Sequence, residues 1–223
     1  MKIKINKLNS SQVEYLNLKE TKLNKNGYYY ISRKEILKLQ AIQTLHNLIR
    51  ETEEVFFVGI DGMSGAGKTT FGKYLAEIFN GNLFHIDDFF QKPTIDELDE
   101  YSKYCSNIDF TKIINTIINP TLNKTNVFYQ PFDVVKHQHL DVIEKKYSRI
   151  NIIEGSFSLH PKIIDYYQYK IFFKIKPIKQ YIRILKRSGF KKSLQFVKRW
   201  IPNENIYNKK LQIEKKANII IKN

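Results

Sequence analysis

The chain has 223 residues and a formal net charge of +15, because 37 Lys and Arg residues stand against 22 Asp and Glu residues. Hydrophobic residues make up 42% of the chain and aromatic residues 13%, which is enough for a sizeable core and excludes a wholly disordered protein. The single cysteine excludes an internal disulfide framework and a cysteine-based zinc site. Such a basic charge is typical of nucleic-acid-binding proteins, but a lysine-rich genome would give the same excess.

Two further features of the sequence concern location and size. The N-terminal residues are basic but lack the apolar stretch of a signal peptide, and no apolar run reaches the roughly 18–20 residues of a membrane span. We therefore expect a cytoplasmic protein that does not contact membranes. The length predicts one large domain, or one domain with an appendage.

In chain order, the first thirty residues are polar and rich in Lys and Asn. From Ser32 onwards apolar residues recur at helical spacing, and Ser32 with Glu35 fits a capping box, which predicts a helix over about 32–50. Residues 55–60 form a continuous apolar run that is typical of a buried parallel strand. The elements predicted after it are helices over 68–79, 108–118 (ended by Pro120), 178–186 and 191–200, and strands over 83–86, 127–129, 150–153, 169–175 and 217–221.

This alternation of apolar strands with helices predicts an α/β fold, with a parallel sheet of about five strands and helices on both faces. Between the first strand and the next helix the sequence reads G-M-S-G-A-G-K-T, which matches the phosphate-binding motif G-x-x-x-x-G-K-[ST]. The backbone N–H groups of such a loop bind phosphate oxygens, and the following helix points its positive end at the same anion. The candidate nucleotide-binding residues are Gly62, Ser64, Gly65, Ala66, Gly67, Lys68, Thr69 and Thr70.

Within this loop we expect Lys68 to contact the β- and γ-phosphates of a nucleoside triphosphate and Thr69 to contact Mg²⁺. Acidic residues end two further predicted strands: Asp87 and Asp88 follow one, and Glu154 follows another. The carboxyl ends of parallel strands meet at one edge of a sheet, so Asp87 is placed to accept a proton from an attacking hydroxyl. Glu154 is placed to hold Mg²⁺. The alternative for either aspartate is that it only caps the next segment or contacts the lysine of the phosphate-binding loop.

Together the motifs G-x-x-G-x-G-K-T-T, D-D-F-F and I-I-E-G, followed by a basic helix, resemble the uridine kinase family of P-loop nucleoside kinases. Phosphoribulokinase and bacterial pantothenate kinase are wider relatives of that family. The resemblance covers about residues 55–222, with the motifs in the family's order. It implies that Asp87 is the general base, that Thr69 and Glu154 are Mg²⁺ positions, and that ATP is the phosphoryl donor.

A further segment, over residues 131–137, is also similar to the family. The segment P-F-D-V-V-K-H implies that Phe132, Asp133 and His137, together with Asp88, bind the substrate. The family usually carries Tyr where this chain has Phe132, which puts specificity for uracil in doubt more than nucleoside binding.

The basic helical region over about 178–200 takes the place of the family's arginine-rich lid, and it contains Arg183, Lys186 and Arg187. The resemblance implies that Arg183 and Arg187 join Lys68 and Asp87 in catalysis, by stabilising charge on the transferred phosphoryl group. Ser188 replaces the acid of the family's R-x-x-R-D pattern, and a solvated basic helix face is the alternative.

The leading hypothesis is an ATP-dependent kinase that phosphorylates a hydroxyl of a small molecule, with the 5′-hydroxyl of a pyrimidine nucleoside as first candidate. Its expected cofactors are ATP and Mg²⁺, and assembly into a homo-oligomer is left open. Residues 1–50 would be an N-terminal extension, and residues 51–223 the P-loop kinase domain. Two alternatives stay open: a kinase for a sugar, a pantothenate-like alcohol or a nucleotide, and a nucleic-acid-binding P-loop ATPase or end-processing kinase.

Overall fold

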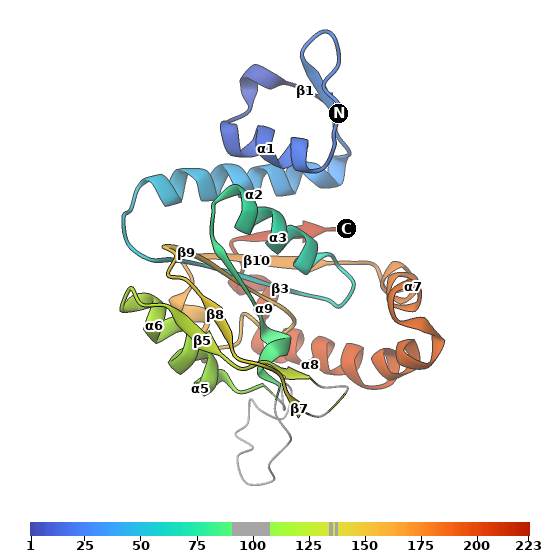
Figure 1. The fold of residues 1–223 in the computed structure, drawn as a ribbon. Helices are drawn as coiled ribbons and strands as arrows, with labels where there is room; N and C mark the ends of the chain where they lie inside the picture. The colour runs from blue at the N-terminus through green and yellow to red at the C-terminus, as the bar shows by residue number, and fades with distance from the viewer. Residues whose placement is uncertain (91–107, 134–135, 137) are drawn as a thin grey trace.

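A computed structural model describes residues 1–90, 108–133, 136 and 138–223 of the chain. At its centre lies a parallel sheet made of β3 (Phe56–Gly62), β4 (Asn82–His85), β9 (Ile150–Glu154), β10 (Tyr169–Lys174) and β11 (Ile219–Lys222). The strand order is β11-β10-β3-β9-β4, with helices on both faces of the sheet (Figure 1). The predicted fold class is therefore confirmed.

The order of the strands changes direction beside β3. From β3 the chain runs outward to β4, returns through β9, and then continues on the other side of β3 with β10 and β11. In register, Glu154 on β9 lies opposite Ile60 on β3 and opposite His85 on β4. Ligands of open α/β sheets bind beyond the carboxyl ends of the strands at such a change of direction.

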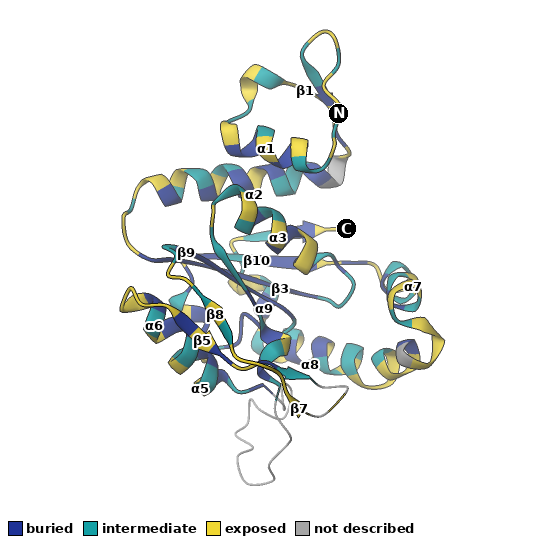
Figure 2. Cartoon of the chain, viewed as in Figure 1, coloured by how far each residue is buried: buried dark blue, intermediate teal, exposed yellow. Residues whose placement is uncertain are grey.

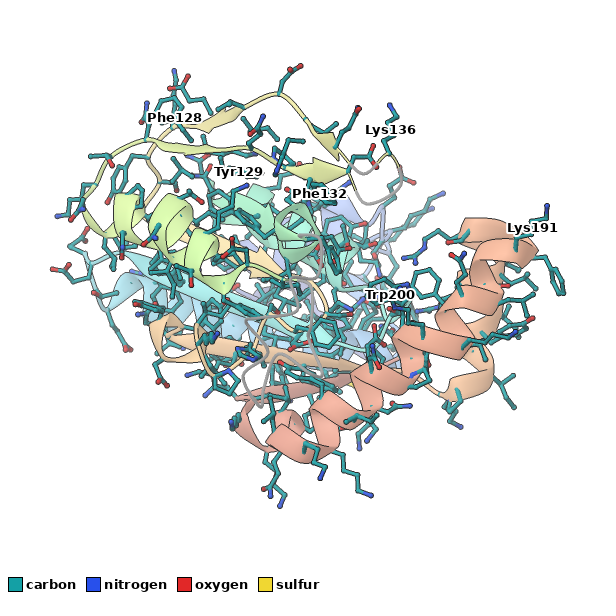
Figure 3. The ribbon with its side chains drawn as sticks, turned by 90° about the horizontal axis from the view of Figure 1, so that it is seen from below. Phe128, Tyr129, Phe132, Lys136, Lys191 and Trp200 are labelled. Carbon is teal, nitrogen blue, oxygen red and sulfur yellow. The ribbon has the colours of Figure 1, made fainter. Side chains whose placement is uncertain are left out.

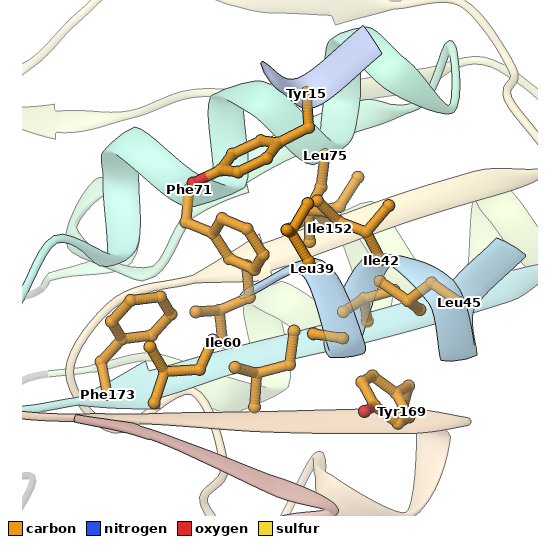
Figure 4. Packing of buried hydrophobic residues seen from close by; sticks show 14 of the residues in the cluster. Tyr15, Leu39, Ile42, Leu45, Ile60, Phe71, Leu75, Ile152, Tyr169 and Phe173 are labelled. Carbon is orange, nitrogen blue, oxygen red and sulfur yellow. The ribbon is translucent and has the colours of Figure 1, made fainter. Parts of the chain in front are cut away.

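Helices α2 (Arg33–Arg50) and α3 (Lys68–Ile78) cover one face of the sheet. Every residue of β3 is buried, which explains why its sequence is continuously apolar from Phe56 to Ile60. In the close view, Leu39 and Ile42 of α2 pack together with Ile60 of β3 (Figure 4). Each fully buried side chain of this size contributes about 1.5–3 kcal/mol to stability.

A second apolar cluster fills the opposite face, so the sheet is the buried middle layer of three (Figure 2). Successive residues of a strand point to opposite faces, and accordingly Phe56 joins the first cluster and Phe57 the second. The helices near this face are α5 (Phe110–Ile113), η4 (Ile114–Ile118), α6 (Asn119–Leu122), η5 (Ile164–Tyr166) and α9 (Ile213–Lys216).

The N-terminal residues form a small unit on the outer side of α2 (Figure 1). It consists of β1 (Lys2–Lys4), η1 (Ile5–Lys7), α1 (Ser10–Leu18) and β2 (Tyr28–Tyr30), with β1 and β2 antiparallel. The capping box predicted for Ser32 and Glu35 is wrong, because the Ser32 side chain makes no capping hydrogen bond. Glu35 instead accepts a hydrogen bond of 2.5 Å from the hydroxyl of Tyr15 on α1. A complete capping box is formed by Asn9 and Gln12 at the start of α1.

The helix predicted to stop before Pro120 continues beyond it. Elements α5, η4 and α6 follow one another directly, and Pro120 lies in the first turn of α6. The backbone stays helical through Ile118 and Asn119, and the Asn119 N–H donates to the carbonyl of Ile114, five residues back, in the wider π turn. Such a π turn changes the hydrogen-bonding pattern just before Pro120, which has no N–H to donate. The hydroxyl of Thr121 donates to the carbonyl of Ile117 at 2.7 Å and further ties the two elements together.

After β10 the chain forms a pair of helices that we call the α7–α8 hairpin. It consists of α7 (Pro177–Gln195), η6 (Phe196–Trp200) and α8 (Ile201–Leu211). A kink at Gly189, whose φ of 74° and ψ of 172° are not helical, interrupts α7. This kink separates the two predicted helices, but the second does not end at Trp200, because η6 continues directly into α8.

Short antiparallel strand pairs and one 3-10 turn complete the described chain. They are β5 (Val127–Tyr129) with β8 (Ile143–Lys145), β6 (Phe132–Asp133) with β7 (Gln138–His139), and η2 (Ile86–Phe89) after β4. The strand predicted over 127–129 is thereby confirmed. No helix in the described ranges has both the length and the apolar character needed to cross a membrane.

Candidate active site

The loop between β3 and α3 encloses the side chain of Lys68, which is only 8% exposed. The Nζ atom of Lys68 donates to the carbonyl oxygen of Gly62 at 2.6 Å, to that of Met63 at 3.2 Å and to the hydroxyl of Ser156 at 3.2 Å. A buried ammonium group needs such partners, because leaving it unpaired costs several kcal/mol. The ammonium is thus held at the mouth of the loop, where an anion bound to the loop could reach it.

Two glycines of the loop have conformations that only glycine adopts readily. Gly62 has a φ of 136°, and a Cβ atom there would lie 2.1 Å from the carbonyl oxygen of Phe173. Gly65 has a φ of 72° and lies against α7, where a Cβ atom would be 3.5 Å from Ile184 and 3.6 Å from Arg183. The motif glycines therefore serve both the curl of the loop and its close packing.

The other predicted nucleotide-binding residues continue the loop into α3. Gly67 precedes the helix with a φ of 99°, and Ala66 is buried. Thr69 and Thr70 are exposed in the first turn of α3. The first turn of a helix presents N–H groups without intrahelical partners and carries partial positive charge, so this turn is suited to binding an anion.

Asp87 and Asp88 lie in η2, directly beyond the carboxyl end of β4. The Asp87 side chain reaches solvent, but the protein atoms around it desolvate the carboxyl group and raise its pKa above the usual value. The Lys68 cation opposes this increase in pKa, and the Glu154 anion adds to it. Desolvation also raises the pKa of Asp88, whose Oδ2 atom accepts a hydrogen bond of 3.2 Å from the hydroxyl of Tyr129.

Glu154, at the end of β9, is 4% exposed and lies 2.6 Å from Nδ1 of His85. This hydrogen bond raises the pKa of His85, because it favours the protonated imidazole, although burial of the ring works in the opposite direction. The protonated form of His85 and the ammonium of Lys68 would offset the negative charges of Glu154, Asp87 and Asp88 at the same sheet edge.

A further carboxylate at this edge, Asp61, was not predicted from the sequence. It is 1% exposed and accepts hydrogen bonds from the backbone N–H groups of Gly62 (2.6 Å), Phe157 (3.1 Å) and Leu159 (2.9 Å), and from the hydroxyl of Tyr207 (2.8 Å). Burial raises the pKa of Asp61, while these donors oppose the increase. The detectable signal was an acidic residue at the end of a continuously apolar strand.

Of the three basic residues predicted for the lid, the structure brings Arg183 to the phosphate-binding loop. Its Nη1 atom donates to the carbonyl oxygen of Gly65 at 3.0 Å. Lys186 and Arg187 are exposed, and the guanidinium of Arg187 lies 5.3 Å from the ring centre of Phe196 in the same hairpin. The structure thus separates Arg183 from the two cations that follow it on α7.

The predicted substrate-binding residues Phe132 and Asp133 form β6, which lies against η2. The ring of Phe132 is half-buried and contacts His139, with 5.3 Å between ring centres. Asp133 accepts a hydrogen bond of 3.0 Å from the backbone N–H of Lys136, so this carboxylate helps to close the turn of its hairpin. His137 lies outside the described residues.

Two aromatic pairs lie in or next to η2, and Phe89 and Phe90 are the two phenylalanines of the D-D-F-F motif. The rings of Phe90 and Trp200 meet edge to face with 5.5 Å between their centres, and those of Phe89 and Tyr129 stack at 5.4 Å. Figure 3 shows Tyr129 and Phe132 on the small strands and Trp200 on the neighbouring α7–α8 hairpin. Phe89 and Tyr129 are buried in the second apolar cluster, whereas Phe90, Phe132 and Trp200 are only partly buried.

The residues predicted to hold Mg²⁺ lie on adjoining elements. Gly72 is three residues beyond Thr69 on α3, and a Cβ atom on Gly72 would be 3.5 Å from Cγ of Glu154. Residues three apart share one face of a helix, so Glu154 packs against the face of α3 that carries Thr69. A hydroxyl and a carboxylate are hard oxygen ligands of the kind that Mg²⁺ takes alongside phosphate oxygens, so these residues fit the ion.

Comparison with known proteins gives one similarity in sequence. No family model matches the chain. Over 114 residues it is 28% identical to uridine-cytidine kinase D of Dictyostelium discoideum, a match that covers 51% of this chain and 22% of that protein. The matched segment thus spans less than a quarter of the length of that relative.

Solved structures show the same fold with low sequence identity. A possible uridine kinase from Bacillus stearothermophilus is 17% identical, with a TM-score of 0.58 over 82% of this chain and 99% of that one. A candidate fructose transport system kinase from Silicibacter sp. TM1040 is 16% identical, with a TM-score of 0.60 over 86% and 99%. The chain has the fold of P-loop kinases, and the resemblance to the uridine kinase family is confirmed.

Proposed function

We propose that this protein is an ATP-dependent kinase that transfers the γ-phosphoryl group to a hydroxyl of a small molecule. One observation carries the proposal: Lys68, Asp87 and Glu154 come from three different elements and converge at one sheet edge. Glu154 lies 2.6 Å from His85, two residues before Asp87, and Lys68 lies 3.2 Å from Ser156, two residues after Glu154. A cation for the phosphates, a base for the hydroxyl and a carboxylate for Mg²⁺ are the parts that phosphoryl transfer to an alcohol requires.

In the proposed reaction, the loop N–H groups and Lys68 hold the triphosphate in line with the acceptor hydroxyl. Asp87 accepts the hydroxyl proton while a bond forms between the acceptor oxygen and the γ-phosphorus, and the bond from that phosphorus to the β–γ bridging oxygen breaks to release ADP. Thr69 and Glu154 would hold Mg²⁺, which neutralises charge on the phosphates when it is bound. Arg183, beside the loop, is placed to stabilise charge on the transferred group.

For the acceptor, we propose a nucleoside phosphorylated at its 5′-hydroxyl, with pyrimidine nucleosides as first candidates. The rings of Phe90, Phe132 and Trp200 lie around η2, and aromatic rings stack favourably on nucleobases. The similarity to uridine-cytidine kinase D supports the same choice. Proposed binding of the substrate by His137 and Asp88 follows from the sequence resemblance alone.

A kinase for another alcohol is the second candidate, and the composition of β6 favours it. Phe132 has no hydroxyl with which to bind a base, and the hydrogen bond from the Lys136 backbone occupies one of the two oxygens of Asp133. Fewer polar groups are therefore available to read a pyrimidine than a nucleoside pocket usually offers.

An acceptor panel tests this proposal. Purified protein with Mg-ATP is given pyrimidine and purine nucleosides, nucleotides, sugars, pantothenate-like alcohols and an oligonucleotide with a free 5′-hydroxyl, and ADP formation is measured. We expect acceptor-dependent ADP formation with at least one pyrimidine nucleoside, and none in the Lys68→Ala variant. Turnover with other alcohols alone would contradict the nucleoside proposal, and turnover with the oligonucleotide alone would contradict a small-molecule acceptor.

A further inference from the structure

A buried carboxylate from the α7–α8 hairpin reaches into the candidate site. Glu204, in the first turn of α8, is 7% exposed. One of its oxygens accepts a hydrogen bond of 3.0 Å from the backbone N–H of Ser64 in the phosphate-binding loop. Its other oxygen accepts hydrogen bonds from the hydroxyl of Ser64 and, at 2.7 Å, from the hydroxyl of Ser156 after β9. One side chain thereby joins three segments that are far apart in the sequence.

The directions of these hydrogen bonds matter for Lys68. The Ser156 hydroxyl has two acceptors within reach, a Glu204 oxygen at 2.7 Å and the Gly62 carbonyl at 3.4 Å. The carboxylate is the closer one and can only accept, so we assign the hydroxyl proton of Ser156 to Glu204. The lone pairs of the Ser156 oxygen then remain for the Lys68 ammonium, which donates to that oxygen at 3.2 Å. Glu204 therefore sets the orientation of a hydroxyl that, together with the Gly62 and Met63 carbonyls, holds the ammonium in place.

The same contacts link the hairpin to the loop at two neighbouring residues. Arg183 of α7 donates to the carbonyl of Gly65, and Glu204 of α8 accepts from Ser64. The two halves of the hairpin are thus fastened to consecutive residues of the loop by groups of opposite charge. A movement of the hairpin that keeps these two contacts would therefore also move Ser64 and Gly65 of the phosphate-binding loop.

Attachment of α8 to the sheet does not by itself require Glu204. Tyr207, one turn further along α8, is buried and donates a hydrogen bond of 2.8 Å to Asp61 at the end of β3. Burying a carboxylate costs several kcal/mol unless hydrogen-bond donors compensate. An apolar residue at position 204 would therefore let α8 pack against the sheet with a smaller loss of solvation free energy. The three donors that compensate Glu204 all belong to the loop and to the serine beside Lys68.

We propose that Glu204 is a positioning residue of the kinase, which orients Ser64 and Ser156 so that Lys68 and the loop are arranged for the triphosphate, and which couples the α7–α8 hairpin to that arrangement. This inference rests on the proposed function for its phosphate ligand. Glu204 acts on Lys68 through Ser156, so substitutions of Glu204 and Ser156 should affect the same interaction.

The test measures binding of Mg-ATP by isothermal titration and steady-state kinetics in Glu204→Gln. A glutamine has one acceptor oxygen and presents an NH₂ group to donors, so it cannot satisfy all three hydrogen bonds. We expect the Kd and KM for Mg-ATP to rise about tenfold or more, in line with the loss of charged hydrogen bonds. The KM for the acceptor should change less than about twofold, which a general loss of structure would not produce.

Two further variants keep the test decisive. Glu214→Gln, in α9, removes a carboxylate that accepts hydrogen bonds from Lys174 and Asn208 away from the loop, and it should leave the affinity for Mg-ATP unchanged. Ser156→Ala should weaken Mg-ATP binding on its own, and adding Glu204→Gln to it should have a smaller effect than in the wild type. If Glu204→Gln does not fold, Ser156→Ala and Ser64→Ala carry the same prediction.

The outcomes separate the two proposals. A wild-type protein that binds no Mg-ATP would overturn the proposed function itself. A wild type that binds Mg-ATP, with folded Glu204→Gln and Ser156→Ala variants of equal affinity, would overturn the role of Glu204 and leave the kinase proposal standing. Fully additive effects of the two substitutions would show that Glu204 does not act through Ser156.

Discussion

Two neighbouring aspartates in η2 have different surroundings, and this difference separates their proposed roles. Asp88 accepts a hydrogen bond from Tyr129, which holds its carboxylate toward β5. Asp87 is exposed, and the charges of Lys68 and Glu154 affect its pKa in opposite directions. A general base needs an accessible lone pair close to the site of phosphoryl transfer, which favours Asp87 over its neighbour.

Replacing Asp87 by Asn should therefore lower kcat by about 10²–10⁴-fold, because an amide cannot accept the hydroxyl proton. The affinity for Mg-ATP should stay close to that of the wild type. Asp88→Asn is the matched variant, and its kcat should fall much less. Near-full turnover by Asp87→Asn in the presence of the acceptor, or a larger loss in Asp88→Asn, would contradict the assignment of the base.

Glu35 is the centre of a buried polar network that links α1 to α2. Burial alone would raise the pKa of Glu35, but hydrogen bonds from Tyr15 and Lys19 and the charge of Lys38 lower it below the usual 4.5. A group whose pKa is lowered by folding stabilises the protein above its unfolded pKa, and this stabilisation is lost as the pH falls through the folded pKa.

Glu35→Gln should accordingly reduce the free energy of unfolding at pH 7 by about 1–3 kcal/mol, as expected for hydrogen bonds to a charged group. The difference from the wild type should shrink below about pH 4. Urea unfolding at pH 7, 5 and 3.5 measures both effects. Glu51→Gln, at the exposed end of α2, is the control and should change stability by less than about 0.5 kcal/mol. An undiminished difference at pH 3.5 would refute the network's contribution.

Among single residues, those inside one short motif were predictable and those joined across the chain were not. Lys68 and its glycines were visible because the loop needs them at fixed spacing. Glu204 contacts Ser64 across 140 positions, and Tyr129 contacts Asp88 across 41, so no local pattern reveals either pair. Their placement depends on how the hairpin and the small strands pack against the sheet. This packing cannot be predicted from a local sequence pattern.

At the scale of elements, the junction between β3 and the phosphate-binding loop determines the geometry of the site. Gly62 ends β3 beside β10, and the carbonyl of Phe173 accepts a hydrogen bond of 3.0 Å from Met63, the next residue in the loop. This close pairing leaves no room for a side chain at Gly62, because a Cβ atom would overlap the backbone of Phe173.

Gly62→Ala should therefore lower the free energy of unfolding by at least about 3 kcal/mol, since strain at positive φ and a clash with backbone combine. Gly27→Ala is the control: its φ is 75°, but the nearest atom to a Cβ there is 3.9 Å away, so only the strain of about 1–2 kcal/mol applies. Urea unfolding compares the two variants. Equal losses would show that the contact with Phe173 does not constrain the loop.

The strands of the central sheet were easier to predict than the ends of the helices. A strand buried on both faces is recognisable as a continuous apolar run, and all five predicted strands of the sheet are present. Helix ends depend on local competition for hydrogen bonds. The Glu35 carboxylate binds Tyr15 and two lysines instead of capping its helix. Pro120 follows a π turn, where the hydrogen-bonding pattern of the helix already departs from the regular one.

At the scale of the whole molecule, three layers place the site at one edge of the sheet, beside the α7–α8 hairpin (Figure 1). The first apolar cluster includes Tyr15 and Leu16 from the N-terminal unit together with residues of the sheet. We propose that residues 1–50 are an extension of the kinase domain that stabilises it through this shared core. The net charge of +15 explains little of the site, where two cations of the described residues, Lys68 and Arg183, donate hydrogen bonds to carbonyls of the loop.

The fate of the γ-phosphoryl group tests the central claim most directly. Phosphorus-31 NMR of a reaction containing the protein, Mg-ATP and a pyrimidine nucleoside follows ATP, ADP, inorganic phosphate and phosphomonoester together. A kinase of the proposed kind gives ADP and a nucleoside 5′-phosphomonoester in equal amounts, with Lys68→Ala inactive. ADP with inorganic phosphate in equal amounts, and no phosphomonoester from any acceptor of the panel, would show that the protein hydrolyses ATP and would contradict transfer to an alcohol.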